Sequence, residues 1–455
     1  IRARLEPGNP NPLLLIAASQ VFLATGHIED ALQALTTEYQ RLVEKYSEKP
    51  APATWRAILN LAIAHESAAT TAPRQTRWTH DPGSQPPAVE HLARHAWADS
   101  HLRTAIGLLK DLVAQRAARS TPAHPDSELP HQRLRLAKLY AATFQYGPAR
   151  DQAERAWNEF RTLPGVGPDH PDTLTARANL AAWTGEAGAL ATARDLYAAL
   201  LPDLVRVLGP DHPHTLTARG NLAARTGETG DPATARDVYA ALLPDMVRVL
   251  GPDHPHTLTT RADLALRTGE AGDPATSRDL FTDLLPDLVR VLGPDHPHTL
   301  TARGNLALRT GEAGDPATSR DLFTDLLPDL VRVLGPHHPN TLTARANLAA
   351  KTGKAGDPAT ARDLFTDLLP DMVRVLGPHH PNTLTTRGNQ AAWTGEAGDP
   401  ATARDLYAAL MPDLVRVLGP HHPVTLTVRS NLAAKTGKAG DPATARDLYA
   451  ALMPD

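Results

Sequence analysis

A stretch of 42 residues recurs seven times in succession and accounts for most of the chain. Each copy begins with Gly-Pro, then Asp or His, then His-Pro, at Gly167, Gly209, Gly251, Gly293, Gly335, Gly377 and Gly419. Copies 251–292 and 293–334 differ at only three positions. A fixed period of this length is typical of solenoids, in which each repeat buries its apolar face only by stacking on its neighbours. The period therefore predicts a stack of repeats rather than a compact globule.

Each copy predicts two helices, as residues 209–250 show. His212-Pro213 opens the first helix, because the residue before proline leaves the helical region and proline fits the first helical position. We expect this helix to stop near Gly227, read as a helix-ending glycine. Asp231-Pro232 opens the second helix. Its apolar residues recur three and four positions apart along one stripe: Ala235, Val238, Tyr239, Leu242, Leu243, Met246, Val249 and Leu250.

A proline lies inside every second helix. Pro244 recurs as Pro202, Pro286, Pro328, Pro370, Pro412 and Pro454. An interior proline removes one hydrogen bond and costs about 3 kcal/mol. The flanking aliphatic side chains contribute about 1.5–3 kcal/mol each when buried. We therefore expect a kinked helix, and a break into two short helices is the alternative.

Composition and charge exclude several classes of function. The 455 residues include no cysteine, which removes disulfides, thiolate metal sites and a cysteine nucleophile and fits a cytoplasmic protein. No run of apolar residues is long enough for a membrane span, so we expect no membrane partner. Residues 1–166 carry a net charge of +3 and the remainder −7. An acidic repeat region suits nucleic acid poorly, because that binding needs clustered cations.

The repeat resembles the tetratricopeptide repeat in its 42-residue, kinesin-light-chain-like form. Leu222-Ala223 match the first helix of that family, Gly230 its turn, Ala235 its helix-crossing residue and Tyr239 its aromatic position. The departures are Thr226 where the family has tyrosine, Gly227 after it, and Pro232 in place of an aromatic residue. The resemblance implies an all-α, right-handed α-solenoid.

The amino-acid sequence of the copies is similar to that of tetratricopeptide arrays in actinobacterial proteins. Many of those proteins carry a nucleotide-binding domain of the NB-ARC type before the array. The chain begins without methionine and stops at Pro454-Asp455, inside a repeat. We therefore expect it to be part of a longer protein, with any nucleotide-hydrolysing domain outside it. Residues 167–455 are then seven repeats, the last one truncated.

Residues 1–166 read as a degenerate region of the same kind. Gly26 and Ala31 keep the repeat's spacing, as do the residues of a later copy: Leu136, Ala137, Tyr140 and Ala149. Residues 55–69 suit one helix, and 88–118 suit a long helix or a close pair. Residues 70–87 have no period and are rich in proline, which predicts an exposed, mobile loop.

No motif for catalysis or for a cofactor is present. The chain lacks a phosphate-binding GxxxxGK[ST] loop and the GxSxG and HExxH motifs, so we expect no enzyme and no cofactor within it. Of 21 histidines, 13 lie in the connectors that start the repeats. A metal-binding edge is one interpretation. Capping of the first helix by the histidine before proline is the favoured one, and neither His91 nor His95 suffices for a metal site.

Two positions of the first helix are the candidate ligand-binding residues. By resemblance this helix lines a concave groove, in which asparagines hold the main chain of an extended peptide. That position is Asn179, Asn221, Asp263, Asn305, Asn347, Asn389 and Asn431. Four residues on, on the same helix face, stand Trp183, Arg225, Arg267, Arg309, Lys351, Trp393 and Lys435. An invariant arginine (Arg219 and its equivalents) is expected to pair with Asp237-type residues and brace successive repeats.

These features predict a non-catalytic scaffold that binds a protein or peptide, with acidic groups on the ligand to meet the cations. By resemblance it is the sensor arm of a larger NB-ARC regulator. Two alternatives stay open: self-assembly through the ends or regular edges of the stack, and metal binding along the histidine edge.

Overall fold

The computed structural model describes residue 36 and residues 87–452, with side chains from Leu102 onward. These residues form helices and turns, without a strand among them. The predictions for Gly26, Ala31, residues 55–69 and the loop of 70–87 concern positions outside the described residues. The chain divides into two compact units, which we call the N-terminal segment (Ile1–Gly230) and the C-terminal segment (Asp231–Asp455).

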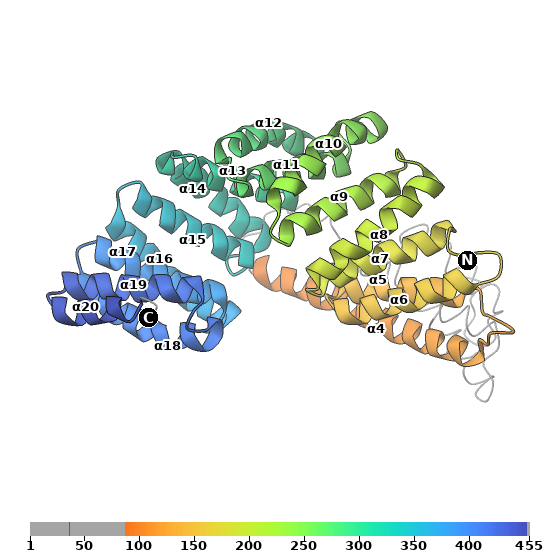
Figure 1. Cartoon of the computed structure of the whole chain (residues 1–455), viewed down its shortest axis with the longest axis horizontal. Coiled ribbons are helices and arrows are strands. Elements are labelled where there is room, and N and C mark those ends of the chain that lie inside the picture. The colour runs from red at the N-terminus through yellow and green to blue at the C-terminus, as the bar shows by residue number, and fades with distance from the viewer. Residues whose placement is uncertain (1–35, 37–86, 453–455) are drawn as a thin grey trace, which may run out of the picture. The chain divides into compact units, whose positions relative to one another are not determined.

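The N-terminal segment contains six described helices, each packed on the next (Figure 1). Residues 88–118 fall in one long helix rather than a pair. Leu136, Ala137 and Ala149 are buried, as their spacing predicts. The helices are α4 (Pro87–Arg119), α5 (Leu129–Ala142), α6 (Tyr146–Thr162), α7 (Pro171–Glu186), α8 (Leu190–Leu208) and α9 (Pro213–Glu228).

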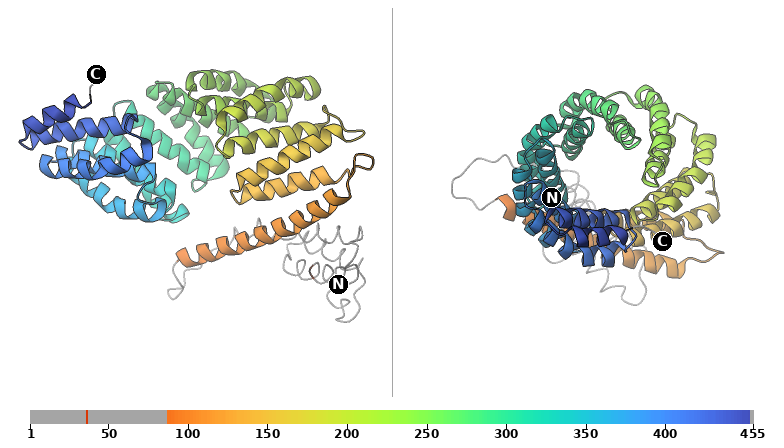
Figure 2. Two further views of the ribbon diagram at one scale, coloured as in Figure 1. Left: turned by 60° about the horizontal axis from the view of Figure 1, so that its bottom comes forward. Right: turned by 60° about the vertical axis from the view of Figure 1, so that its left-hand side comes forward.

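The C-terminal segment repeats one helix pair, and its helices follow one another along a curved path (Figure 2). Small residues such as Ala361 lie fully buried where the two helices of a pair cross. The helices are α10 (Pro232–Leu250), α11 (Pro255–Glu270), α12 (Pro274–Leu292), α13 (Pro297–Glu312), α14 (Pro316–Leu334), α15 (Pro339–Lys354), α16 (Pro358–Leu376), α17 (Pro381–Glu396), α18 (Pro400–Leu418), α19 (Pro423–Lys438) and α20 (Pro442–Ala450).

The connector between repeats is held by its histidine and threonine. The Nδ1 atom of His296 accepts a hydrogen bond from the backbone N–H of His298, at 3.2 Å, and the histidine before each repeat's proline does the same. The fully buried Thr299 donates its hydroxyl proton to the carbonyl oxygen of Gly293, at 2.8 Å. The capping interpretation of these histidines is confirmed, and it gives the His-Pro-x-Thr sequence a structural role.

The end of the first helix differs from the prediction. The helix continues past the glycine of Thr-Gly-Glu and ends one residue later, as α11 ends at Glu270 after Gly269. The glycine that leaves the helical region is Gly272, with φ of 98°. Glycine adopts such positive φ values without the steric penalty of a side chain. Gly227 and its equivalents are therefore interior helix residues, and another contact accounts for them.

Replacing His338 with Asn should flatten the acid side of the stability profile. Burial lowers the pKa of His338 below its ordinary 6.5, so the unfolded chain takes up the proton first. The cap made by His338 therefore contributes to the free energy of unfolding above about pH 6.5, and this contribution is lost as the pH falls. The reason is that a protonated ring cannot accept a hydrogen bond from the backbone N–H of Asn340. Asparagine also caps helices, so stability at neutral pH should change by less than about 0.5 kcal/mol.

Urea unfolding at about pH 7, 6 and 5 tests this, in a window above the titration of the carboxylates. His214→Asn is the control, since the exposed His214 does not cap its helix with its side chain. Equal pH slopes for wild type and His338→Asn would contradict the assignment.

The second helices run unbroken through their internal prolines. Helix α14 is continuous from Pro316 to Leu334 and contains Pro328 on its exposed side. The alternative of two short helices is therefore wrong. Because the ring faces solvent, the carbonyl of Thr324 that loses its N–H partner also lies on the exposed side.

An arginine of the first helix spans the proline. Arg303 donates from Nη1 to Oδ2 of Asp329, at 2.6 Å, and from Nη2 to the carbonyl oxygen of Asp325, at 3.3 Å. These acceptors lie one residue after and three residues before Pro328. The pairing predicted for the invariant arginine is thus wrong in two respects. Its partner is the aspartate after the proline, and the contact joins the two helices of one repeat; Asp237 instead pairs with its neighbour Arg236.

The same aspartate continues the network into the connector. Asp329 also accepts a hydrogen bond from Arg332, at 2.8 Å, and Arg332 forks onto both carboxylate oxygens of Asp295. Hydrogen bonds from Arg303 and then Arg332 hold the pKa of Asp329 below its usual value. Connector, first helix and second helix of one repeat are therefore tied together around the proline.

Candidate ligand-binding face

The first helices of successive repeats lie closer together than the second helices. Helix α13 contacts α11 and α15, and α17 contacts α15 and α19, whereas no described pair of successive second helices makes comparable contact. In a curved stack the elements on the inside of the curve approach one another. The first helices of the C-terminal segment therefore lie on the inner side of its curve.

A pocket of about 180 Å³ opens between α11 and α13. Its floor consists of buried apolar side chains, among them Phe281. Polar side chains stand on both walls. The wall residues are Thr259, Ala262, Asp263 and Leu266 of α11, and His298, Thr301, Ala302 and Asn305 of α13.

An equivalent pocket of about 260 Å³ lies between α17 and α19, three repeats further along. Tyr407 forms its floor in place of Phe281, and Asn389 and Asn431 stand on its walls. Val424 replaces the histidine of the first pocket. The inner face thus repeats one shape while single side chains change.

The predicted asparagine row lies on this face. All seven of its members are half-buried, and four of them line the two pockets: Asp263 and Asn305 between α11 and α13, and Asn389 and Asn431 between α17 and α19. Two asparagines have a partner in the chain: the Nδ2 of Asn221 donates to the hydroxyl of Tyr197, at 3.0 Å, and that of Asn431 donates to Tyr407, at 3.3 Å. Their contact with a ligand stays a prediction.

The column four residues on is more deeply buried than the asparagines. Trp183, Arg267, Arg309, Lys351 and Lys435 are each less than one-tenth exposed, and Arg225 and Trp393 are half-buried. Five of these side chains pack on the glycine of the preceding repeat's Thr-Gly-Glu or Thr-Gly-Lys: Arg225, Arg309, Lys351, Trp393 and Lys435. A Cβ atom added to Gly353 would lie 2.7 Å from the ring of Trp393. This close approach is why that helix position is glycine.

The cations of this column are held by carboxylates. Lys435 lies 2.7 Å from Glu396 of the preceding repeat, and Arg309 lies 2.6 Å from Glu312 in its own helix. Lys351 differs from these two cations in its electrostatics, since burial and the nearby Lys354 lower its pKa. Sequence spacing correctly placed the column on the helix face of the asparagines, but it could not indicate that the next repeat covers it. Contact between these column residues and a ligand stays a prediction, and their burial speaks against it.

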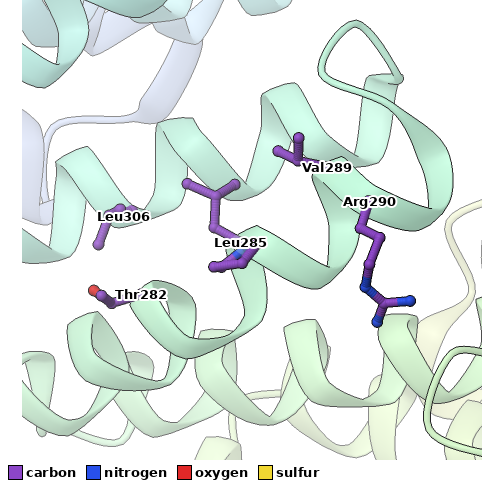
Figure 3. A pocket seen from close by; sticks show the side chains of 6 residues that line it. Thr282, Leu285, Val289, Arg290 and Leu306 are labelled. Carbon is purple, nitrogen blue, oxygen red and sulfur yellow. The ribbon is translucent and has the colours of Figure 1, made fainter.

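The outer helices carry a pocket of another kind. About 500 Å³ of space is lined by Thr282, Leu285, Pro286, Val289 and Arg290 of α12 and by Leu306 of α13 (Figure 3). Val289 is 41% exposed, and similar valines recur on the other second helices. Arg290 is already bound to Asp253 and Asp287. This surface therefore offers apolar contact with little polar selectivity, unlike the face with the asparagines.

Two properties of the described residues bear on function. No three His, Asp or Glu side chains among them are grouped so that they could hold a metal ion. None of the described helices combines the length and the apolar character that a membrane crossing needs. The two pockets of the inner face are lined by amides, hydroxyls and apolar side chains, with the carboxylate of Asp263 and the ring of His298 on the walls of the first.

Comparison with known proteins identifies the repeat. A family model described as tetratricopeptide repeat matches residues 173–214, 215–256, 257–298, 299–340 and 341–382. No curated protein matches the sequence. A candidate kinesin light chain from Podosopora anserina with nearly identical repeats is 21% identical, with a TM-score of 0.40 over 44% of this chain and 94% of its own.

Two solved structures agree in fold over most of the chain. The quorum sensor NprR of B. thuringiensis has a TM-score of 0.54 at 9% identity, covering 88% of this chain and 97% of its own. A STAND ATPase of Pyrococcus horikoshii with a tetratricopeptide repeat sensor has a TM-score of 0.50 at 11% identity, covering 87% of this chain and 55% of its own. The array is an all-α solenoid, and five of its repeats, over residues 173–382, match the tetratricopeptide repeat family.

Proposed function

We propose that the chain is a non-catalytic scaffold that binds an extended segment of a protein along the first helices of its C-terminal segment. The observation that carries this proposal is the pocket between α11 and α13, where a half-buried asparagine stands over an apolar floor. The amide of Asn305 lines that pocket and has no hydrogen-bond partner among the described residues. A carboxamide both donates and accepts hydrogen bonds, so it can hold the main chain of a ligand in either direction.

The ligand we propose is neutral at its points of contact. The cations that suggested acidic groups on the ligand are largely buried between repeats and, as with Arg309 and Lys435, paired with glutamates. Main-chain amides and aliphatic side chains fit the face better than carboxylates do. The extended mode of peptide recognition, in which main-chain bonds give affinity and pockets select side chains, matches these requirements.

A role as the sensor arm of a larger nucleotide-switched regulator is the specific form of this proposal. It draws support from the sequence resemblance to NB-ARC-associated arrays. The Pyrococcus horikoshii STAND protein, whose repeats are described as a sensor, shares the fold.

A peptide selected on the protein tests the proposal. A phage library of random peptides of about 12 residues, long enough for an extended segment to cross several repeats, is panned on the chain. The tightest binder is then made with fluorescein for anisotropy titration. Replacing Asn305, Asn347 and Asn389 together with Ala should weaken binding about tenfold or more, because each neutral hydrogen bond contributes about 0.5–1.5 kcal/mol.

Asn158→Ala is the matched control, since this exposed asparagine lies on α6 in the N-terminal segment. Circular dichroism should show the same helicity for all variants. Failure to select any peptide, or equal affinity of the triple variant and the wild type, would overturn the proposal.

A further inference from the structure

One aromatic position of the second helix sets the state of the asparagine that follows it by 24 residues. Tyr239 at this position is followed by Asp263. At two other tyrosines the phenol oxygen accepts a hydrogen bond from the asparagine: Asn221 donates to Tyr197 and Asn431 to Tyr407. Both tyrosines are 1% exposed, and burial raises the pKa of each to about 12. The phenols therefore stay neutral, and each occupies one donor of an amide.

Three consecutive repeats have phenylalanine there instead. Phe281, Phe323 and Phe365 are at most 1% exposed, so the ring is buried as deeply as in the tyrosine repeats. The asparagines that follow them have no hydrogen-bond partner among the residues that the structure describes: Asn305, Asn347 and Asn389. The presence or absence of one phenol oxygen per repeat therefore distinguishes a hydrogen-bonded asparagine from one without a partner.

A half-buried amide without a partner is unfavourable, since it has lost part of its hydration without a replacement bond. The three phenylalanine-backed asparagines follow one another without interruption in the C-terminal segment. At Asn305 the adjoining pocket has the ring of Phe281 in its floor. The open amides and this apolar floor complement alternating main-chain and side-chain groups of an extended polypeptide.

We propose that phenylalanine or tyrosine at this position decides which asparagines are open to a ligand, and that the reading patch is Asn305, Asn347 and Asn389. This inference rests on the proposed function and specifies where the ligand lies. Its ligand class is an extended polypeptide segment that presents main-chain amides, with an aliphatic side chain directed at the pocket between α11 and α13. Phe281, Phe323 and Phe365 act through the asparagines and do not contact the ligand's main chain themselves. Without a hydroxyl group, they leave the asparagine amides free of a hydrogen bond from below.

The test adds only three oxygen atoms. The variant with F281Y, F323Y and F365Y should keep its fold, because tyrosine is already accommodated at Tyr197 and Tyr407 with the same burial. The fluorescein-labelled peptide selected on the wild-type chain is the probe. Its affinity should fall about tenfold or more, since each new phenol competes for one amide. The reverse variant, Tyr197→Phe with Tyr407→Phe, should bind the peptide at least as tightly as wild type.

A second readout needs no ligand. In protein labelled with ¹⁵N-asparagine, the side-chain amide protons of Asn305, Asn347 and Asn389 should exchange with solvent faster than those of Asn221 and Asn431. The triple tyrosine variant should remove this difference, and unchanged exchange would overturn the inference.

The binding outcomes separate the two proposals. If the triple alanine variant loses affinity and the triple tyrosine variant keeps it, the inference is wrong and the proposed function stands. If both variants keep wild-type affinity, the peptide binds elsewhere and both are wrong. If no peptide can be selected, the proposed function itself fails.

Discussion

Gly353→Ala should lower the free energy of unfolding by about 1–2 kcal/mol, although alanine is the better helix former. The added Cβ would lie 2.7 Å from three carbon atoms of the Trp393 ring. Overpacking of this kind costs about 1–3 kcal/mol, and the gain in helix propensity offsets up to about 1 kcal/mol of that. An indole ring has no flexible end that could move aside, so the two helices must separate.

The chain supplies the control in the same kind of helix. Gly304→Ala meets only the Cδ2 atom of Leu326, at 3.6 Å, which is ordinary contact. This variant should be more stable than wild type by about 0.5–1 kcal/mol, from helix propensity alone. The same substitution therefore changes sign between two first helices, depending on what the next repeat places over the glycine.

Urea unfolding followed by circular dichroism measures both variants. Hydrogen exchange across α15 and α17 then shows whether Gly353→Ala loosens that junction locally. Trp393→Ala in the Gly353→Ala background should remove the clash, so that the two substitutions are not additive. Equal stability of Gly353→Ala and Gly304→Ala would contradict the packing assigned to this column.

Arg303→Met should lower the free energy of unfolding by about 1–2 kcal/mol. Hydrogen bonds to charged groups contribute about 1.5–3 kcal/mol, and solvent reduces this because the two side chains are 24% and 31% exposed. Pro328→Ala should have the opposite effect and stabilise the protein by about 1–2 kcal/mol. An interior proline costs about 3 kcal/mol, of which part is already offset here by its exposed position and its arginine.

A double-mutant cycle joins these two predictions. Arg303→Met should cost less when Pro328 is also replaced by Ala. The N–H of residue 328 then bonds to the carbonyl oxygen of Thr324, so this turn of the helix depends less on the bonds from Arg303. Arg278→Met is the control: its partner is the exposed neighbour Asp279, so the effect should stay within about 0.5 kcal/mol. Strict additivity in the cycle would contradict the role assigned to Arg303.

The local features of the fold were predictable because they depend on neighbours in the chain. His-Pro and Asp-Pro mark helix starts through φ restriction and capping, and the structure begins its helices at those prolines. The stripe that contains Ala235, Tyr239, Leu242 and Met246 is buried as its spacing predicts. The proline required an energetic comparison, which favoured an unbroken helix, and the helices are continuous through it. The kink expected at the proline stays a prediction.

The candidate site was predictable only as a helix face. Positions four residues apart share a face, so Asn305 and Arg309 point the same way from α13. The rotation of α13 about its own axis decides which of these two side chains stays exposed and which is covered by the neighbouring repeat. This rotation depends on how whole helices pack against one another. Asn305 lines a pocket, while Arg309 lies on Gly269 and is 7% exposed.

The sequence by itself determined the period, the helix starts and the apolar stripes, since each follows from bonds and spacings within about one helical turn. Only the tertiary structure decided three further points: the partner of the invariant arginine, the reason for the glycine in Thr-Gly-Glu, and which asparagines have a phenol beneath them. Each of these depends on two helices meeting at one register, and register across helices follows from the packing of many side chains at once.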